Sequence, residues 1–184
     1  MISEKAKQSF VTTLARALDD ALGDLTGEIE TETNQLESAS EITEDEFSML
    51  TISSYQFRVI FMLHFTITSP IRHYLADRAH IELQQMTDER CYDYLGEVGN
   101  AICGSIKRDL GHHFMHIGMS VPYRMDTRSM AFVENLHYDH ELHMQAQVGE
   151  EVGFHASLFV CSYGNLDFEL VYDEDESLGE LELF

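Results

Sequence analysis

The chain has 184 residues, a hydrophobic fraction of 44% and a formal net charge of −22, with a pI near 4.5. This length and hydrophobic content predict one folded domain with a substantial core rather than a disordered chain. The excess of acidic residues argues against nucleic acid and anionic membrane surfaces as partners, and it favours a partner with a basic rim.

Neither a secretory signal nor a membrane-spanning segment is predicted. The first residues lead directly into an amphipathic pattern, and the longest apolar stretch, Val59 to Ile67, contains His64 and is too short to cross a bilayer. Three cysteines without paired spacing are typical of reduced thiols. We therefore expect a cytoplasmic protein.

The first predicted element is a helix over residues 3–22, because Phe10, Leu14 and Leu18 share one face. Gly23 is suited to end this helix. The helix is followed by an acidic segment that runs to Glu46 and contains neither an aromatic nor a basic residue.

That acidic segment is interpreted mainly as a loop. It has room for a short strand at 27–31, but residues 34–46 are predicted to be exposed, and 24–50 is assigned as an acidic loop region. Residues 55–65 then show the alternation of a strand, with one apolar face and a second face that is partly apolar. Pro70 suits the first turn of a helix that runs from Ser69 towards Ala79.

A long helix is predicted from Thr87 to Leu110. Acidic residues at its start and basic residues at its end complement the helix macrodipole, and Gly111 is suited to stop it. At about 100° per residue, one narrow apolar stripe is predicted to be buried. Its members are Cys91, Leu95, Val98, Ile102 and Ile106.

The opposite side of this helix carries Asp93, Glu97, Asn100 and Gly104, here called the polar stripe. Polar residues opposite a core face are most often simply solvated. However, a glycine inside a helix costs about 1 kcal/mol relative to alanine, and asparagine is also a weak helix former. Two weak formers in one exposed line indicate a surface on which another molecule docks.

The C-terminal half is predicted to form four strands, at 115–121, 138–148, 152–160 and 166–172, the first ending at Pro122. With the preceding helices this pattern predicts an α+β fold, a two-layer sandwich of a largely antiparallel sheet with long helices on one face. It forms a single domain over residues 1–172, and 173–184 is an acidic C-terminal tail.

Two histidine sets invite a metal-site interpretation, namely His112, His113 and His116, and His137, His140 and His143. Metal ligands must converge on one point. Strand alternation directs His140 away from the other members of the second set, so no bound metal is predicted. No glycine-rich phosphate loop or nucleophile motif is present in the sequence.

The spacing Asp93-x3-Glu97-x2-Asn100-x3-Gly104, followed by Pro122 with 21 residues between Asn100 and the proline, resembles the CheC/CheX/FliY family of chemotaxis phosphatases. The likeness is closest to CheX-like proteins and extends over most of the chain. It implies the same sheet-and-helix fold. Some relatives carry a second Glu-x2-Asn pair on the first helix, and this chain does not, so one active stripe per chain is expected.

The resemblance implies a phosphatase that removes the aspartyl phosphate from a CheY-like response-regulator receiver domain in chemotaxis or two-component signalling. Glu97 and Asn100 become the candidate catalytic residues, Asn100 as the group that orients the attacking water. Asp93 and Gly104 become partner-binding residues. No cofactor is expected on this chain, since magnesium would be held by the receiver.

The resemblance also implies a homodimer that pairs through sheet edges. An alternative is a non-catalytic adapter that binds a receiver or a component of the flagellar switch. A scaffold protein, which needs only the fold and the acidic surface, is a third interpretation.

Overall fold

The computed structural model describes residues 1–23 and 31–172. At its centre lies a seven-stranded antiparallel sheet in the order β1-β6-β7-β3-β2-β4, with β5 also paired to β2. The strands are β1 (Thr31–Gln35), β2 (Glu46–Ser53), β3 (Phe57–Phe65), β4 (Gly118–Met119), β5 (Tyr123–Asp126), β6 (His140–Val148) and β7 (Val152–Ser162).

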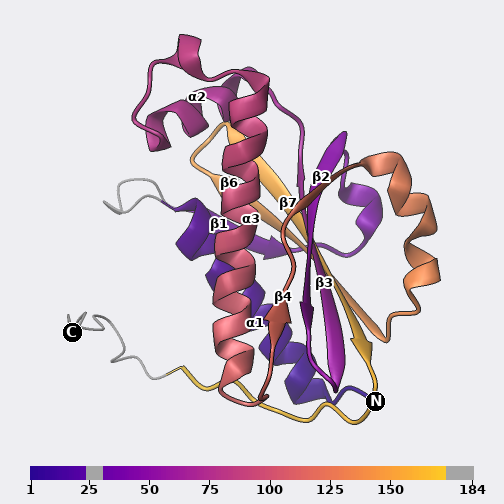
Figure 1. Cartoon of the computed structure of the whole chain (residues 1–184). Coiled ribbons are helices and arrows are strands. Elements are labelled where there is room, and N and C mark those ends of the chain that lie inside the picture. The colour runs from indigo at the N-terminus through magenta and orange to yellow at the C-terminus, as the bar shows by residue number, and fades with distance from the viewer. Residues whose placement is uncertain (24–30, 173–184) are drawn as a thin grey trace, which may run out of the picture.

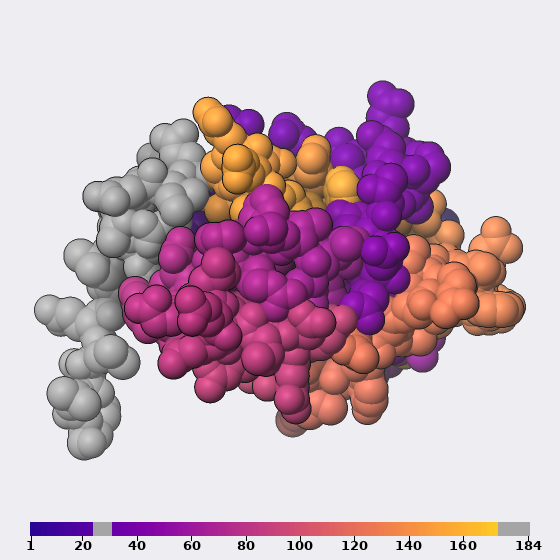
Figure 2. Space-filling view, turned by 90° about the horizontal axis from the view of Figure 1, so that it is seen from above, coloured from indigo at the N-terminus to yellow at the C-terminus, as the bar shows by residue number. Residues whose placement is uncertain are grey.

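In the described part of the chain, three α-helices accompany the sheet: α1 (Glu4–Leu22), α2 (Ser69–Arg78) and α3 (Asp88–Gly111). The 3-10 segments are η1 (Ala39–Glu41), η2 (Leu83–Gln85) and η3 (Thr127–Leu136). α1 and α3 lie on one side of the sheet and η3 on the other (Figure 1). Seen from the end that carries α2, η3 stands well apart from the segment between α2 and α3 (Figure 2).

Local signals explain where these elements begin and end. The Ser3 hydroxyl accepts a hydrogen bond from the Ala6 N–H and caps α1, whose last turn is closed by Gly23. Thr68 and Thr87 cap α2 and α3 in the same way. Gly149 has a φ of 58°, a left-handed conformation that favours glycine, in the tight turn between β6 and β7.

The sheet buries apolar side chains on both faces. On the helix face, which is covered by α1 and α3, the alternate β3 residues from Phe57 to Phe65 are almost completely buried. On the opposite η3 face, Phe47, Ile60, Met62 and Phe159 form a smaller cluster beneath the half-buried apolar residues of η3. The predicted α+β sandwich with long helices on one face is confirmed, and η3 is an additional, unexpected cover.

The region expected to be an acidic loop contains two strands. β1 begins at Thr31, and β2 begins at Glu46 inside the assigned 24–50 loop region. β2 escaped detection because apolar residues face both sides of the sheet, which removes the alternating pattern. The strand considered at 27–31 lies almost wholly outside the described residues, as does the predicted tail at 173–184.

The C-terminal strand predictions were right for β6 and β7 and wrong elsewhere. The strand expected at 115–121 is reduced to β4, and pairing with β2 resumes as β5 only after Pro122, which has no N–H to donate. Residues 166–172 pair with no strand of the described chain, and Leu166 makes an isolated bridge to Ile2. Their alternate side chains pack on α1 and on the end of α3 instead of entering the sheet.

The β6–β7 hairpin occupies the interior of the sheet, since β1 covers β6 and β3 covers β7. Among residues 1–23 and 31–172, the sheet therefore ends at β1 on one side and at β4 and β5 on the other. None of the helices in the described part of the chain combines the length and the apolar character that crossing a bilayer requires.

Candidate functional site

The candidate site is built on α3, which is fixed by its buried face. The predicted apolar stripe is buried apart from Val98, which is partly exposed, and Cys103 is buried as well. Gly99 allows the helix to approach β2 closely, because a Cβ there would lie 3.0 Å from Leu50 Cδ1. The helix includes Gly111, which was expected to follow it, and His112 is its C-cap.

A buried carboxylate anchors the C-terminal end of α3. Asp109 is 3% exposed and accepts hydrogen bonds from Thr13 and Arg16 of α1. The hydroxyl of Tyr172 also donates to Asp109 over 2.8 Å, and the Arg16 guanidinium lies 4.1 Å from the centre of the Tyr172 ring. These contacts tie α3 to α1 and to the last described residues, so α3 presents its outer face on a rigid support.

The polar stripe lies on that outer face. Asp93 and Glu97 are exposed, and Asn100 and Gly104 are partly exposed. Within residues 1–23 and 31–172, the side chains of Asp93, Glu97 and Asn100 make neither a hydrogen bond nor an ion pair. A Cβ at Gly104 would meet no atom within 4 Å. The four predicted residues thus share one accessible surface and keep their polar groups available to another molecule.

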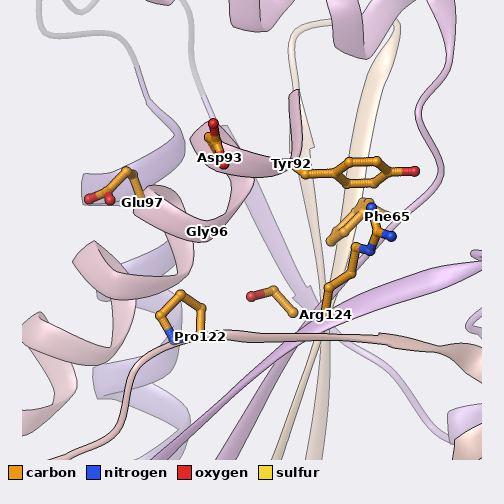
Figure 3. A pocket seen from close by; sticks show the side chains of 8 residues that line it. Phe65, Tyr92, Asp93, Gly96, Glu97, Pro122 and Arg124 are labelled. Carbon is orange, nitrogen blue, oxygen red and sulfur yellow. The ribbon is translucent and has the colours of Figure 1, made fainter. Parts of the chain in front are cut away.

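A cleft of about 560 Å³ opens beside the start of the polar stripe (Figure 3). One wall is α3, and the other is the chain around Pro122 and β5. Gly96 faces Pro122, since a Cβ on Gly96 would lie 3.6 Å from Pro122 Cγ. The proline singled out in the sequence therefore lies next to the polar stripe. The lining residues are Ser48, Phe65, Tyr92, Asp93, Gly96, Glu97, Pro122 and Arg124.

Arg124 and Tyr92 form the far end of this cleft. The Arg124 guanidinium lies 3.9 Å from the centre of the Tyr92 ring, and its Nε is 3.6 Å from a carboxylate oxygen of Glu46. Interaction with Glu46 raises the pKa of the Tyr92 hydroxyl. Sequence analysis did not identify Arg124, Tyr92 or Ser48 as site residues. Only the position of Arg124, two residues after Pro122, offered a signal.

A second polar cluster lies beneath η3, away from the polar stripe. The Ser157 hydroxyl is 2.8 Å from His64 Nε2 and 2.9 Å from His143 Nδ1, and His155 contacts Glu44. Burial lowers the pKa of His64 to about 4, so the imidazole is neutral near pH 7. Ser157 is 0% exposed, so no substrate reaches it, and this serine–histidine cluster is structural.

The remaining histidines and the cysteines do not assemble into a further site. His112, His113 and His116 are exposed, and His140 and His143 lie on opposite faces of β6. Among the residues that the structure describes, no group of three or more potential ligands is arranged to hold a metal ion. Burial raises the pKa of the Cys91 and Cys103 thiols, which disfavours the reactive thiolate.

Comparison with known proteins gives matches at the level of structure. No protein-family sequence model matches the chain, and no curated protein sequence is significantly similar to it. The crystal structure of the chemotaxis protein CheX from Vibrio vulnificus is similar with a TM-score of 0.62 and 15% identity, covering 82% of this chain and 98% of that one.

A CheX–CheY–BeF3–Mg²⁺ complex from Borrelia burgdorferi also contains a similar chain, with a TM-score of 0.60, 14% identity, and 85% and 97% coverage. A CheC-like protein from Shewanella oneidensis is similar with a TM-score of 0.59 and 12% identity, covering 84% of this chain and 99% of that one. The chain therefore has the fold of the CheX and CheC-like proteins, and the fold implied by the sequence resemblance is confirmed.

Proposed function

We propose that this protein is a phosphatase for the aspartyl phosphate of a CheY-like receiver domain. The observation that carries the proposal is the polar stripe, in which Glu97 and Asn100 lie one turn apart on a rigid helix and lack partners within the described residues. The shared fold adds support, because one protein with this fold was crystallised with CheY, BeF3 and Mg²⁺.

In the proposed mechanism Asn100 orients the water that attacks the phosphorus atom. A carboxamide both donates and accepts hydrogen bonds, so one side chain can hold a water in line with the bond that breaks. The phosphate remains on the receiver, together with the receiver's magnesium and lysine, and this chain supplies only the missing orientation. That division of labour requires no cofactor on this chain.

The other stripe residues hold the receiver in register. Glu97, one turn before Asn100, is placed to pair with the receiver lysine in a charge-assisted contact. Gly104 leaves room for close approach, and Asp93 extends the contact towards the start of α3. Since the proposed partner is a cytoplasmic signalling domain, we expect this protein to act in the cytoplasm.

A non-catalytic adapter is the competing function, because α1 carries no second Glu-x2-Asn pair. Decay of a phosphorylated receiver separates the two. An enzyme accelerates decay when present at a small fraction of the receiver concentration, whereas an adapter forms a complex and leaves decay unchanged or slower. Acceleration that appears only at stoichiometric amounts would contradict the proposed function.

We also propose a homodimer formed through the edge made by β4 and β5. This edge has no further strand partner among the described residues, and it carries exposed apolar side chains at Met119, Val121 and Tyr123. Sedimentation at tens of micromolar should then show a species of twice 21.1 kDa. A monomer at that concentration would contradict the dimer.

A further inference from the structure

The η3 face of the sheet holds a cluster of ionisable side chains that the proposed function does not use. At its centre the Ser157 hydroxyl contacts one nitrogen of His64 at 2.8 Å and one of His143 at 2.9 Å. On the same face the His155 imidazole contacts the Glu44 carboxylate. His64, His143 and Ser157 are at most 5% exposed, so a role for them must act through the fold.

The two imidazoles at the centre are arranged for the neutral state. Ser157 has one hydroxyl proton, so it can donate to one ring and accept from the other. The second ring nitrogens, His64 Nδ1 and His143 Nε2, are buried and have no hydrogen-bond partner among residues 1–23 and 31–172. A ring that carries both protons is therefore a buried charge with one N–H that lacks an acceptor, which is costly unless water enters.

The charges around His64 come from three neighbouring elements. Burial lowers the pKa of His64 to about 4. Glu44, just before β2, favours the protonated ring, whereas His155 on β7 and His143 on β6 oppose it. Glu141 on β6 lies 3.6 Å from His143 Nε2. The charged residues that η3 itself carries are both exposed: Arg128 and Glu134.

Water would reach these rings most easily from beneath η3, which lies on their side of the sheet (Figure 1). The His64 ring centre is 5.4 Å from that of Phe47, and the His143 ring centre is 5.7 Å from that of Phe159. Both phenylalanines belong to the small apolar cluster that η3 covers with half-buried residues. Hydration of the imidazoles therefore requires η3 to separate from this cluster.

Glu44 ties the same cluster to the start of η3. Its carboxylate contacts His155, and its backbone carbonyl accepts a hydrogen bond from the Thr127 hydroxyl at 2.6 Å. The Thr127 N–H donates to the Asp45 carbonyl at 2.9 Å. Thr127 begins η3 and directly follows β5, which carries Arg124 of the cleft beside the polar stripe. A displacement of η3 therefore acts on one wall of that cleft.

We propose that the cluster of His64, His143, Ser157, His155 and Glu44 is a pH-sensitive switch that controls how firmly η3 is held on the sheet. At neutral pH the uncharged central rings keep η3 closed. In acid, protonation opens η3 and loosens β5 behind it, while α1 and α3 stay folded on the other face. This proposal concerns the fold around the cleft and does not depend on the proposed function.

Hydrogen exchange followed by mass spectrometry tests the switch. The full chain is compared at pH 7 and pH 5, and each rate is corrected for the intrinsic pH dependence of amide exchange. The open state takes up the proton with the ordinary His64 pKa of 6.5 and the closed state with a pKa of about 4, so opening becomes easier as the pH falls below 6.5. This difference predicts a rise of about twentyfold in the corrected exchange rate of residues 127–136 at pH 5.

The other elements serve as internal references. Residues 123–126 in β5 should show a smaller rise, and residues 88–111 in α3 should show none. If η3 exchanges no faster at pH 5, or if α3 accelerates equally, the switch is wrong. Faster exchange in η3 with β5 unchanged would overturn its link to the cleft.

A pair of variants assigns the effect to the buried ring. His64→Gln keeps a hydrogen-bonding side chain near Ser157 but takes up no proton in this range, so most of the acid-induced rise should disappear. His112→Gln removes an exposed histidine and should behave as wild type. A full acid response in folded His64→Gln contradicts the proposal, and if melting shows that this variant is unfolded, the comparison of η3 with α3 in the wild type decides alone.

Discussion

The two faces of the sheet are buried by different means. The helix face packs against α1 and α3 through an almost wholly apolar core. On the η3 face, the described residues form a smaller apolar cluster of Phe47, Ile60, Met62 and Phe159 under a half-buried helical cover, beside the polar cluster of His64, His143, His155 and Ser157. The difference relates to the candidate site. The face with the denser apolar core carries α3, the helix that must hold the polar stripe in a fixed position.

Replacing one buried phenylalanine on each face should show the largest difference in unfolding free energy between the two faces. Phe61 on the helix face and Phe159 on the η3 face are both 0% exposed. Phe61→Ala should lower the free energy of unfolding by about 4 kcal/mol, and Phe159→Ala by at least about 1 kcal/mol less, because its half-buried neighbours can collapse into the space. Urea denaturation of both variants gives the two values, and equal losses would break the comparison.

Acid should destabilise the η3 face through His64. Burial lowers the pKa of His64 to about 4, even though Glu44 favours the charged form, while the unfolded chain has the ordinary value of 6.5. The unfolded state therefore binds the proton first, and stability falls as the pH drops from about 6.5 through 4. The full loss amounts to about 3 kcal/mol.

The measurement is the unfolding free energy of wild type and His64→Gln between pH 7 and pH 4.5. His143 and the carboxylates contribute to both proteins, so the difference between the two profiles isolates His64. Wild type should lose stability more steeply than the variant across this range. Parallel profiles would show that His64 takes up its proton without penalty.

The smallest expected effect is at Gly104, on the outer side of the helix layer. A methyl group there meets open space, so Gly104→Ala should raise the free energy of unfolding by up to about 1 kcal/mol through helix propensity alone. Receiver affinity should fall, because the methyl lies in the docking surface. Gly111→Ala, also in open space but at the end of α3, is the control. A stabilised variant with full affinity would remove Gly104 from that surface.

The sequence predicted α3 well because its signals are local. The acidic start, the basic end and the 3.6-residue period of buried residues are all readable along one stretch of chain, and this period also defines the polar stripe on the opposite side. β2 was missed because Phe47 and Met49 face η3 while Leu50 and Ile52 face the helices, so no alternation marks it.

Residues 166–172 show the opposite error, because they have the alternating pattern of a strand but do not join the sheet. Leu166 and Phe168 alternate with exposed residues as they would in a strand, yet they are buried by α1 and the end of α3 rather than by a sheet face. The cleft could not be predicted at all, because Ser48, Tyr92 and Arg124 come from three elements that only the folded chain brings together.

The central claim is that Asn100 acts on the reaction while the rest of the polar stripe holds the partner. Asn100→Ala should leave stability unchanged or slightly raised, since alanine is the better helix former, and it should largely preserve receiver binding through Glu97. Gln8→Ala, an exposed change on α1, is the matched control and should behave as wild type.

The decisive measurement is the decay of a phosphorylated CheY-type receiver with wild type, Asn100→Ala and Gln8→Ala at equal folded concentration. Loss of one orienting group should slow the catalysed decay on the order of 10²-fold in Asn100→Ala while affinity stays within a few-fold of wild type. Decay that remains within about threefold of wild type in Asn100→Ala would contradict the mechanism and remove Asn100 from it.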